Sequence, residues 1–175
     1  MDSFALYCLA TEIRPAETLR VLGLIERRLI ADPADPEARL YKGALLARLG
    51  LAMDDPGQAR RFLNAGIGIM RAMPPAKATR ALAHLRMLYA RGTTQVLLPV
   101  PPMTAPEMDR GIAQILNHPG FGQLHGSRRA VVLGMQAHLL KQRGQDQSAA
   151  RIWSAATLIE GRLRGFPETP PQIIL

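Results

Sequence analysis

The histidines and the single cysteine are the residues whose side chains could bind a metal ion or act in catalysis. Four histidines, at positions 84, 118, 125 and 138, and Cys8 are spread along 175 residues. A structural zinc site normally needs four ligands, and a catalytic zinc site needs three. The chain has no cysteine pair and no His-x-x-x-His sequence. We therefore predict no metal site and no catalytic centre.

Two short glycine sequences are the candidates for a loop that holds a phosphate group. Gly66-Ile67-Gly68 falls inside an expected helix, and Gly120-Phe121-Gly122 neither follows a strand nor precedes a Lys-Ser or Lys-Thr pair. Phosphate-binding loops need their glycines at the turn between a strand and a helix. We therefore expect no cofactor, and we expect that the protein is not an enzyme.

Positive charge is the most distinctive property of the composition. The chain has 22 Lys and Arg against 14 Asp and Glu, which gives a net charge of +8. Lysine occurs only at positions 42, 77 and 141, so the other 19 basic residues are arginines. Because a guanidinium forms paired hydrogen bonds with carboxylate or phosphate, three partner classes suit such a chain: nucleic acid, an anionic membrane surface and an acidic protein.

Length and composition indicate a globular protein without a membrane span. Hydrophobic residues make up 47% of the chain and charged residues 21%, which is enough for one packed core. The N-terminal residues lack the basic segment of a secretory signal, and the longest apolar run, 96–106, contains four prolines. A single cysteine allows no intramolecular disulfide. We expect a cytoplasmic protein.

Helical periodicity and helix boundary residues recur along the whole chain, and no segment alternates in polarity as a strand does. An aspartate before a first-turn proline marks two helix starts, at Asp35-Pro36 and Asp55-Pro56. Glycines at positions 50, 92 and 144 are placed to end helices. We predict eight helices, near residues 3–12, 15–31, 36–53, 56–71, 76–91, 105–117, 128–143 and 147–164, with Ser127 and Asp146 as the caps of the last two.

Two proline-rich segments interrupt this pattern, at residues 93–104 and 165–175. Proline neither continues a helix nor donates to a β-ladder, so we expect the first segment to be an ordered, extended crossing. The predicted organisation is one helical domain over residues 1–164, which includes this crossing, and a C-terminal tail. The tail ends in Ile173-Ile174-Leu175. It either docks on the last hairpin, docks on a neighbouring copy in a homo-oligomer, or frays.

Two of the expected helix pairs share an arrangement of small and large residues. Small residues let two antiparallel helices approach closely, and a large residue between them fills the remaining space. The pattern is small, large, small at positions i, i+4 and i+7, and it is formed by Ala59, Leu63 and Gly66 and again by Ala149, Trp153 and Ala156. This pattern is typical of the αα-hairpin of a helical repeat.

On these residues the chain resembles a tetratricopeptide-repeat protein of degenerate form. The best match covers residues 131–156, and the resemblance extends over 15–72 and 127–161, although the family's 34-residue period is not kept. The resemblance implies an all-α fold in which antiparallel helical hairpins stack as a short α-solenoid. An unrelated all-α bundle with glycine-terminated helices is the alternative.

The resemblance also implies a binding surface, because the first helices of such hairpins line a concave face that typically holds a partner's peptide. We therefore expect a non-enzymatic module, an adaptor or assembly factor, whose partner offers an acidic or C-terminal peptide or a helix. For the arginines the alternative is a solvated helix face, and for the tyrosines a place in the core. The residues expected to line this cationic groove are Tyr41, Arg48, Arg86, Tyr89, His138 and Lys141.

Nucleic acid is the alternative partner. The arginine pairs Arg27-Arg28, Arg60-Arg61 and Arg128-Arg129 could contact phosphates. They are scattered over three expected hairpins, aromatic residues make up only 5% of the chain, and no recognition-helix motif is present. A membrane surface is less favoured, since no helix is basic on one side and rich in Trp and Phe on the other.

Overall fold

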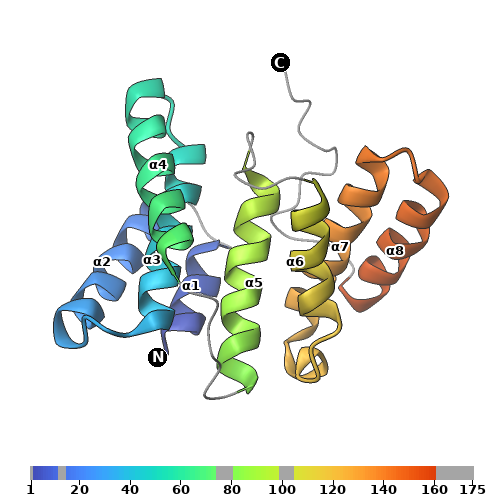
Figure 1. Ribbon diagram of the computed structural model, residues 1–175, viewed down its shortest axis with the longest axis horizontal. Helices are drawn as coiled ribbons and strands as arrows, with labels where there is room; N and C mark the ends of the chain where they lie inside the picture. The colour runs from blue at the N-terminus through green and yellow to red at the C-terminus, as the bar shows by residue number, and fades with distance from the viewer. Residues whose placement is uncertain (1, 12–14, 74–80, 99–104, 161–175) are drawn as a thin grey trace. The chain divides into compact units, whose positions relative to one another are not determined.

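A computed structural model describes residues 2–11, 15–73, 81–98 and 105–160. These residues form eight α-helices and one 3-10 helix, and none of them is in a strand (Figure 1). The all-α prediction is confirmed for this part of the chain. The helices are α1 (Ser3–Thr11), α2 (Pro15–Ala31), α3 (Pro36–Leu51), α4 (Pro56–Ala72), α5 (Ala81–Leu97), α6 (Ala105–Leu116), α7 (Gly126–Gln142) and α8 (Asp146–Ile159), with η1 (Phe121–Gln123) between α6 and α7.

The chain divides into two compact units, Met1–Thr94 and Gln95–Leu175, and the boundary falls within the last turn of α5. In the first unit α2 packs against α3 and α3 against α4, while α1 contacts both α2 and α3. In the second unit α7 packs against both α6 and α8. Packing between neighbours in sequence is typical of helical hairpins and is consistent with a solenoid-like fold. The prediction of one domain over residues 1–164 stays a prediction.

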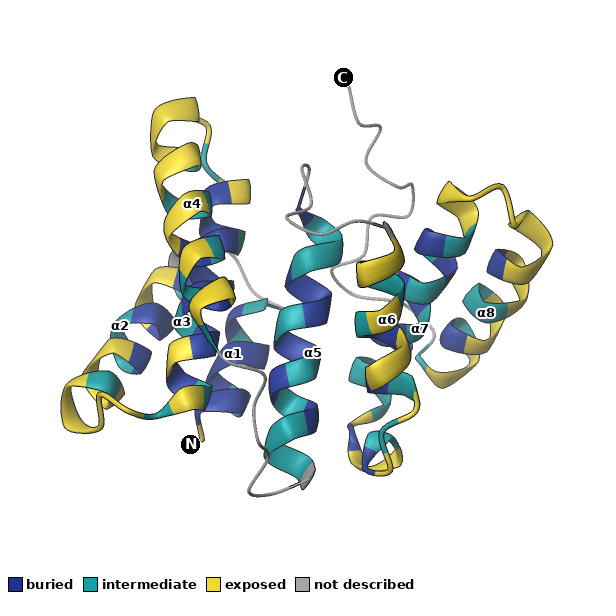
Figure 2. Cartoon of the chain, in the orientation of Figure 1, coloured by how far each residue is buried: buried dark blue, intermediate teal, exposed yellow. Residues whose placement is uncertain are grey.

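The α3–α4 hairpin is held at very short range by its small residues. A Cβ atom placed on Gly66 would lie 2.5 Å from the backbone nitrogen of Ala47 and 2.5 Å from the carbonyl oxygen of Gly43. A Cβ atom on Gly50 would lie 2.8 Å from the carbonyl oxygen of Ala59. The predicted use of small residues for close helix packing is therefore confirmed in this hairpin. Figure 2 shows the result, a mostly buried α3 beside an α4 with one exposed face.

Two predicted helix caps are confirmed and two are wrong. The Asp35 carboxylate accepts a hydrogen bond from the Ala38 amide at 3.0 Å, and that of Asp55 accepts one from the Gln58 amide at 2.6 Å. Ser127 does not cap α7, because Nδ1 of His125 accepts from the Ser127 amide and the helix begins earlier. Asp146 is itself the first residue of α8.

Helix ends depend on glycine in one case and not in two others. Gly144 follows α7 with φ +72°, a left-handed conformation that glycine adopts without strain, so its predicted role is confirmed. Gly50 lies inside α3, which ends at Leu51. Gly92 lies inside α5, five residues before its end.

Helix α5 overturns the expectation that a helix ends at Arg91 and an extended crossing follows. Residues 93–97 are helical, and the hydroxyl of Thr93 donates to the carbonyl oxygen of Tyr89 at 2.8 Å. Thr93 and Thr94 are both fully buried. The packing of this turn outweighs the cost of about 1 kcal/mol for a glycine inside a helix. The rest of the expected crossing, 99–104, and the tail, 165–175, lie outside the described residues.

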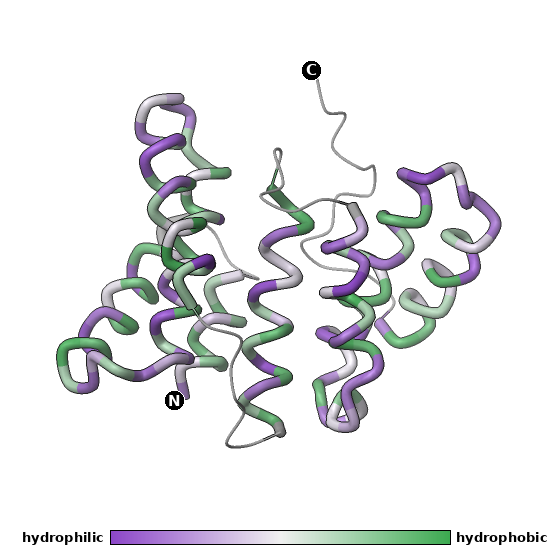
Figure 3. Tube along the Cα trace, in the orientation of Figure 1, coloured by the Kyte–Doolittle hydropathy of each residue, from purple (hydrophilic) through white to green (hydrophobic). Residues whose placement is uncertain are grey.

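Polarity varies along every helix, as Figure 3 shows for the described chain. Within the described ranges each helix is too short or too polar to cross a bilayer.

Candidate functional site

The structure divides the six predicted groove residues between the two units. Tyr41 and Arg48 lie on α3 and Arg86 and Tyr89 lie on α5, all within the first unit. His138 and Lys141 lie on α7 in the second unit. The first four are brought together around α1, and this cluster is the candidate site.

Helix α1 covers the two tyrosines of the predicted groove. The ring of Tyr7 stacks on that of Tyr41 with centroids 5.3 Å apart, and the ring of Phe4 meets Tyr89 edge-on at 5.8 Å. The exposed fraction is 0% for Tyr41 and 5% for Tyr89. The structure thus places both tyrosines in the core, which is the alternative that the sequence left for them.

The hydroxyl of Tyr41 is also used internally. It donates to Oε2 of Glu37 at 3.0 Å, one turn earlier on α3. Burial, and after it the Glu37 carboxylate, raise the pKa of Tyr41 above its usual value. Tyr41 is therefore a protonated core residue that holds its own helix, and no part of it faces a partner in this structure.

Arg86 is neutralised within the chain. Its Nη1 donates to Oδ2 of Asp2 at 3.1 Å, and its guanidinium lies over the ring of Phe4, 5.1 Å from the centroid. The hydrogen bond from the Ala5 amide, and with it the charge of Arg86, lowers the pKa of Asp2. Asp2 thus supplies the carboxylate for Arg86 that we expected a partner protein to supply.

Arg48 has no such acid. Its Nε donates to Oγ1 of Thr94 at 3.3 Å, its Nη2 reaches Oγ1 of Thr93 at 3.5 Å, and its guanidinium lies 5.8 Å from the centroid of Tyr7. No carboxylate of the described residues pairs with it. Its Nη1 meets no acceptor among these residues and is not enclosed. Arg48 is a half-buried cation that two threonines orient, and its Nη1 has no acceptor among the described residues.

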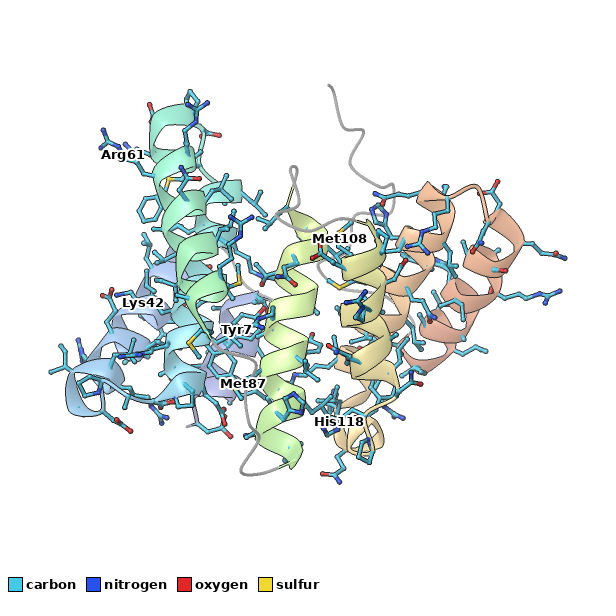
Figure 4. The ribbon with its side chains drawn as sticks, in the orientation of Figure 1. Tyr7, Lys42, Arg61, Met87, Met108 and His118 are labelled. Atoms are coloured by element: carbon cyan, nitrogen blue, oxygen red, sulfur yellow. The ribbon has the colours of Figure 1, made fainter. Side chains whose placement is uncertain are left out.

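The hydroxyl of Tyr7 organises the groups around Arg48. It lies 3.3 Å from Oγ1 of Thr93 and 3.2 Å from Oγ1 of Thr94, and it reaches the carbonyl oxygen of Ala90 at 3.4 Å. The guanidinium of Arg48 lies over the same ring. Figure 4 labels Tyr7, whose side chain lies beside α5. The two threonines accept from Arg48 while they contact Tyr7, so one polar network joins α1, α3 and α5.

His138 and Lys141 form a separate, smaller feature on α7. Nε2 of His138 lies 2.9 Å from Nε2 of Gln142, one turn along the helix. Burial, and after it the positive charge of Lys141, lower the pKa of His138. Lys141 is exposed in the last turn of α7, where a cation interacts favourably with the helix dipole.

This lowered pKa gives a prediction for the pH dependence of stability. Between the lowered pKa of folded His138 and its unfolded value of about 6.5, the unfolded chain binds more protons, so stability falls as the pH falls. We expect the His138→Gln variant to lose less unfolding free energy than the wild type between pH 7.5 and pH 5. Urea denaturation at both pH values measures the two losses, and equal losses would contradict the prediction.

Sequence reasoning missed the residues that complete the Arg48 environment. Nothing in the local sequence indicated which residues Tyr7 would contact. Thr93 and Thr94 were assigned to the expected crossing.

Among the described residues, no group of three His, Cys, Asp or Glu side chains could hold a metal ion. No protein-family model matches this chain, and comparisons with curated proteins and with solved structures find no match.

Proposed function

We propose that this protein is a non-enzymatic helical interaction module, related in form to degenerate tetratricopeptide repeats, that binds an acidic segment of a partner protein as an adaptor or assembly factor. The observation that carries the proposal is the environment of Arg48, a half-buried guanidinium without a carboxylate partner among the described residues.

A partly buried charge costs free energy unless it is paired. The uncharged hydroxyls of Thr93 and Thr94 hold Arg48 at long hydrogen-bond distances, so they orient the group without neutralising it. An incoming carboxylate would supply the missing charge and would accept from the open Nη1. Charge-assisted hydrogen bonds of this kind are about twice as strong as neutral ones.

Fewer of the predicted groove residues remain candidates for contact with a partner. Tyr41 and Tyr89 are covered by α1, and Arg86 is paired with Asp2. Arg48 is left as the member of the first-unit cluster that suits an acidic residue or a C-terminal carboxylate. Substitution of Arg86 would break an ion pair within the chain, so Arg48 is the position to test.

The test is capture of the partner from the native cell by tagged chains. We expect Arg48→Glu to reduce capture at least tenfold relative to the wild type, because the charge that meets the carboxylate is reversed. Arg39→Glu, on the exposed side of the same helix, makes the same change in net charge and should leave capture intact.

A milder variant separates binding from folding. Arg48→Gln retains a hydrogen-bonding side chain and should keep the helical circular dichroism and melting temperature while it weakens capture. Equal capture by the wild type, Arg48→Glu and Arg48→Gln would contradict the proposal.

A further inference from the structure

The outward face of α4 carries a feature that the proposed protein-binding role does not use. Arg60, Arg61 and Arg71 are exposed there, and Pro56–Ala72 contains no acidic residue. At 100° per residue these arginines flank a line of exposed Gly57, Asn64 and Gly68. Figure 4 shows Arg61 projecting away from the helical hairpin.

Three other cations of the first unit pair with acids. Arg20 pairs with Glu17 at 2.8 Å, Lys42 pairs with Glu26 at 2.8 Å, and Arg86 pairs with Asp2. Arg60 and Arg61 pair with no carboxylate of the described residues. The exposed charges within Pro56–Ala72 are therefore all positive, whereas solvated helices usually mix both signs of charge.

The absence of large exposed apolar side chains on this face distinguishes between two kinds of acidic partner. The large hydrophobic residues that are exposed in the described chain lie on α2, α3 and α8, and none lies on α4. An exposed ion pair contributes little binding free energy, so three of them without an apolar centre hold a protein weakly. Binding of a nucleic-acid phosphate backbone does not require burial of apolar surface, because each phosphate that is neutralised releases counterions.

The aromatic residue of α4 favours a duplex over a single strand. Proteins that bind single strands stack bases on exposed aromatic rings. Phe62 is half-buried and, at 100° per residue, lies on the same side of α4 as Gly66. We propose that the outward face of α4 binds the phosphate backbone of a nucleic-acid duplex, without reading its bases.

The dimensions of the face suit this ligand. Arg60 and Arg71 are eleven residues apart, which is about 16 Å along a helix and about five base-pair steps at 3.4 Å. Gly68 has open space beside it, since an added Cβ atom would meet nothing within 4 Å. A duplex backbone can therefore approach the helix closely between the arginines.

Fluorescence anisotropy with a 20-base-pair duplex of random sequence, over a series of salt concentrations, tests the proposal. The triple variant Arg60→Gln, Arg61→Gln, Arg71→Gln removes the three positive charges from this face of α4. The control Arg20→Gln, Arg27→Gln, Arg39→Gln removes three exposed arginines from α2 and α3, so both variants have the same net charge. We expect the α4 variant to lose about tenfold or more in affinity at 50 mM salt, and its salt slope to fall by about 3.

The control variant should retain most of the wild-type affinity and the wild-type slope. Equal losses in both triple variants would overturn the proposal, since net charge alone would then explain binding, and so would the lack of binding by the wild type at 50 mM salt. Binding of poly-glutamate as tightly as of the duplex would assign the face to an acidic protein instead. Arg48→Glu should still bind the duplex, so this experiment and partner capture can fail independently.

Discussion

Replacement of Gly66 by alanine is expected to lower the free energy of unfolding of the protein by about 3 kcal/mol, the upper end of the usual cost of overpacking. The added Cβ atom would lie 2.5 Å from backbone atoms of both Ala47 and Gly43. Backbone atoms cannot rotate away as a side chain can, so α3 and α4 must move apart. Their separation would also loosen the contact between Gly50 and Ala59.

Gly68→Ala is the matched control, on the same helix and two residues away. Its Cβ atom would meet nothing within 4 Å, so the higher helix propensity of alanine should raise stability by about 0.5–1 kcal/mol. Urea denaturation followed by circular dichroism measures both changes. A Gly66→Ala protein as stable as Gly68→Ala would show that the hairpin is not closely packed.

The Tyr7→Ala variant should lose about 4 kcal/mol of unfolding free energy, as expected for removal of a buried aromatic ring. Tyr7 has an exposed fraction of 0%, stacks on Tyr41 and supports Arg48. A nine-residue helix such as α1 is not stable by itself, so its rings are what keep it folded. Loss of Tyr7 should therefore weaken the docking of α1 as a whole.

Tyr7→Phe separates the ring from the hydroxyl. It keeps the stacking with Tyr41 but leaves the buried hydroxyl of Thr94 without Tyr7, so we expect a loss of about 1–2 kcal/mol. Thermal and urea denaturation of the two variants give the comparison. If Tyr7→Ala cost no more than Tyr7→Phe, α1 would not be part of the core, and Tyr41 and Tyr89 would be available to a partner.

The two proposals concern different chemistry on different helices of the first unit. Arg48 is a single oriented cation beside buried hydroxyls, which suits one carboxylate. The α4 face is an extended row of exposed arginines, which suits a repeating phosphate backbone. Burial makes the first site depend on geometry, whereas exposure makes the second depend on salt.

The sequence by itself determined the elements of this protein wherever the signal is local. The caps Asp35 and Asp55, the prolines after them and Gly144 act within one helical turn, so their roles could be predicted. The close α3–α4 packing was also predictable, because the small residues Ala59 and Gly66 recur on one face of one helix and the partner helix is its neighbour in sequence.

Only the tertiary structure decided what the predicted groove contains. The contacts of Tyr7 with Thr93 and Thr94 join residues 86 and 87 positions apart, and that of Arg48 with Thr94 joins residues 46 apart. No local pattern records such pairings. These long-range contacts extend α5 past Gly92 and place Tyr41 and Tyr89 in the core. They also leave Arg48 as a cation without an acid among the described residues. Burial depends on which segments distant in sequence come to lie together, so a local pattern does not predict it.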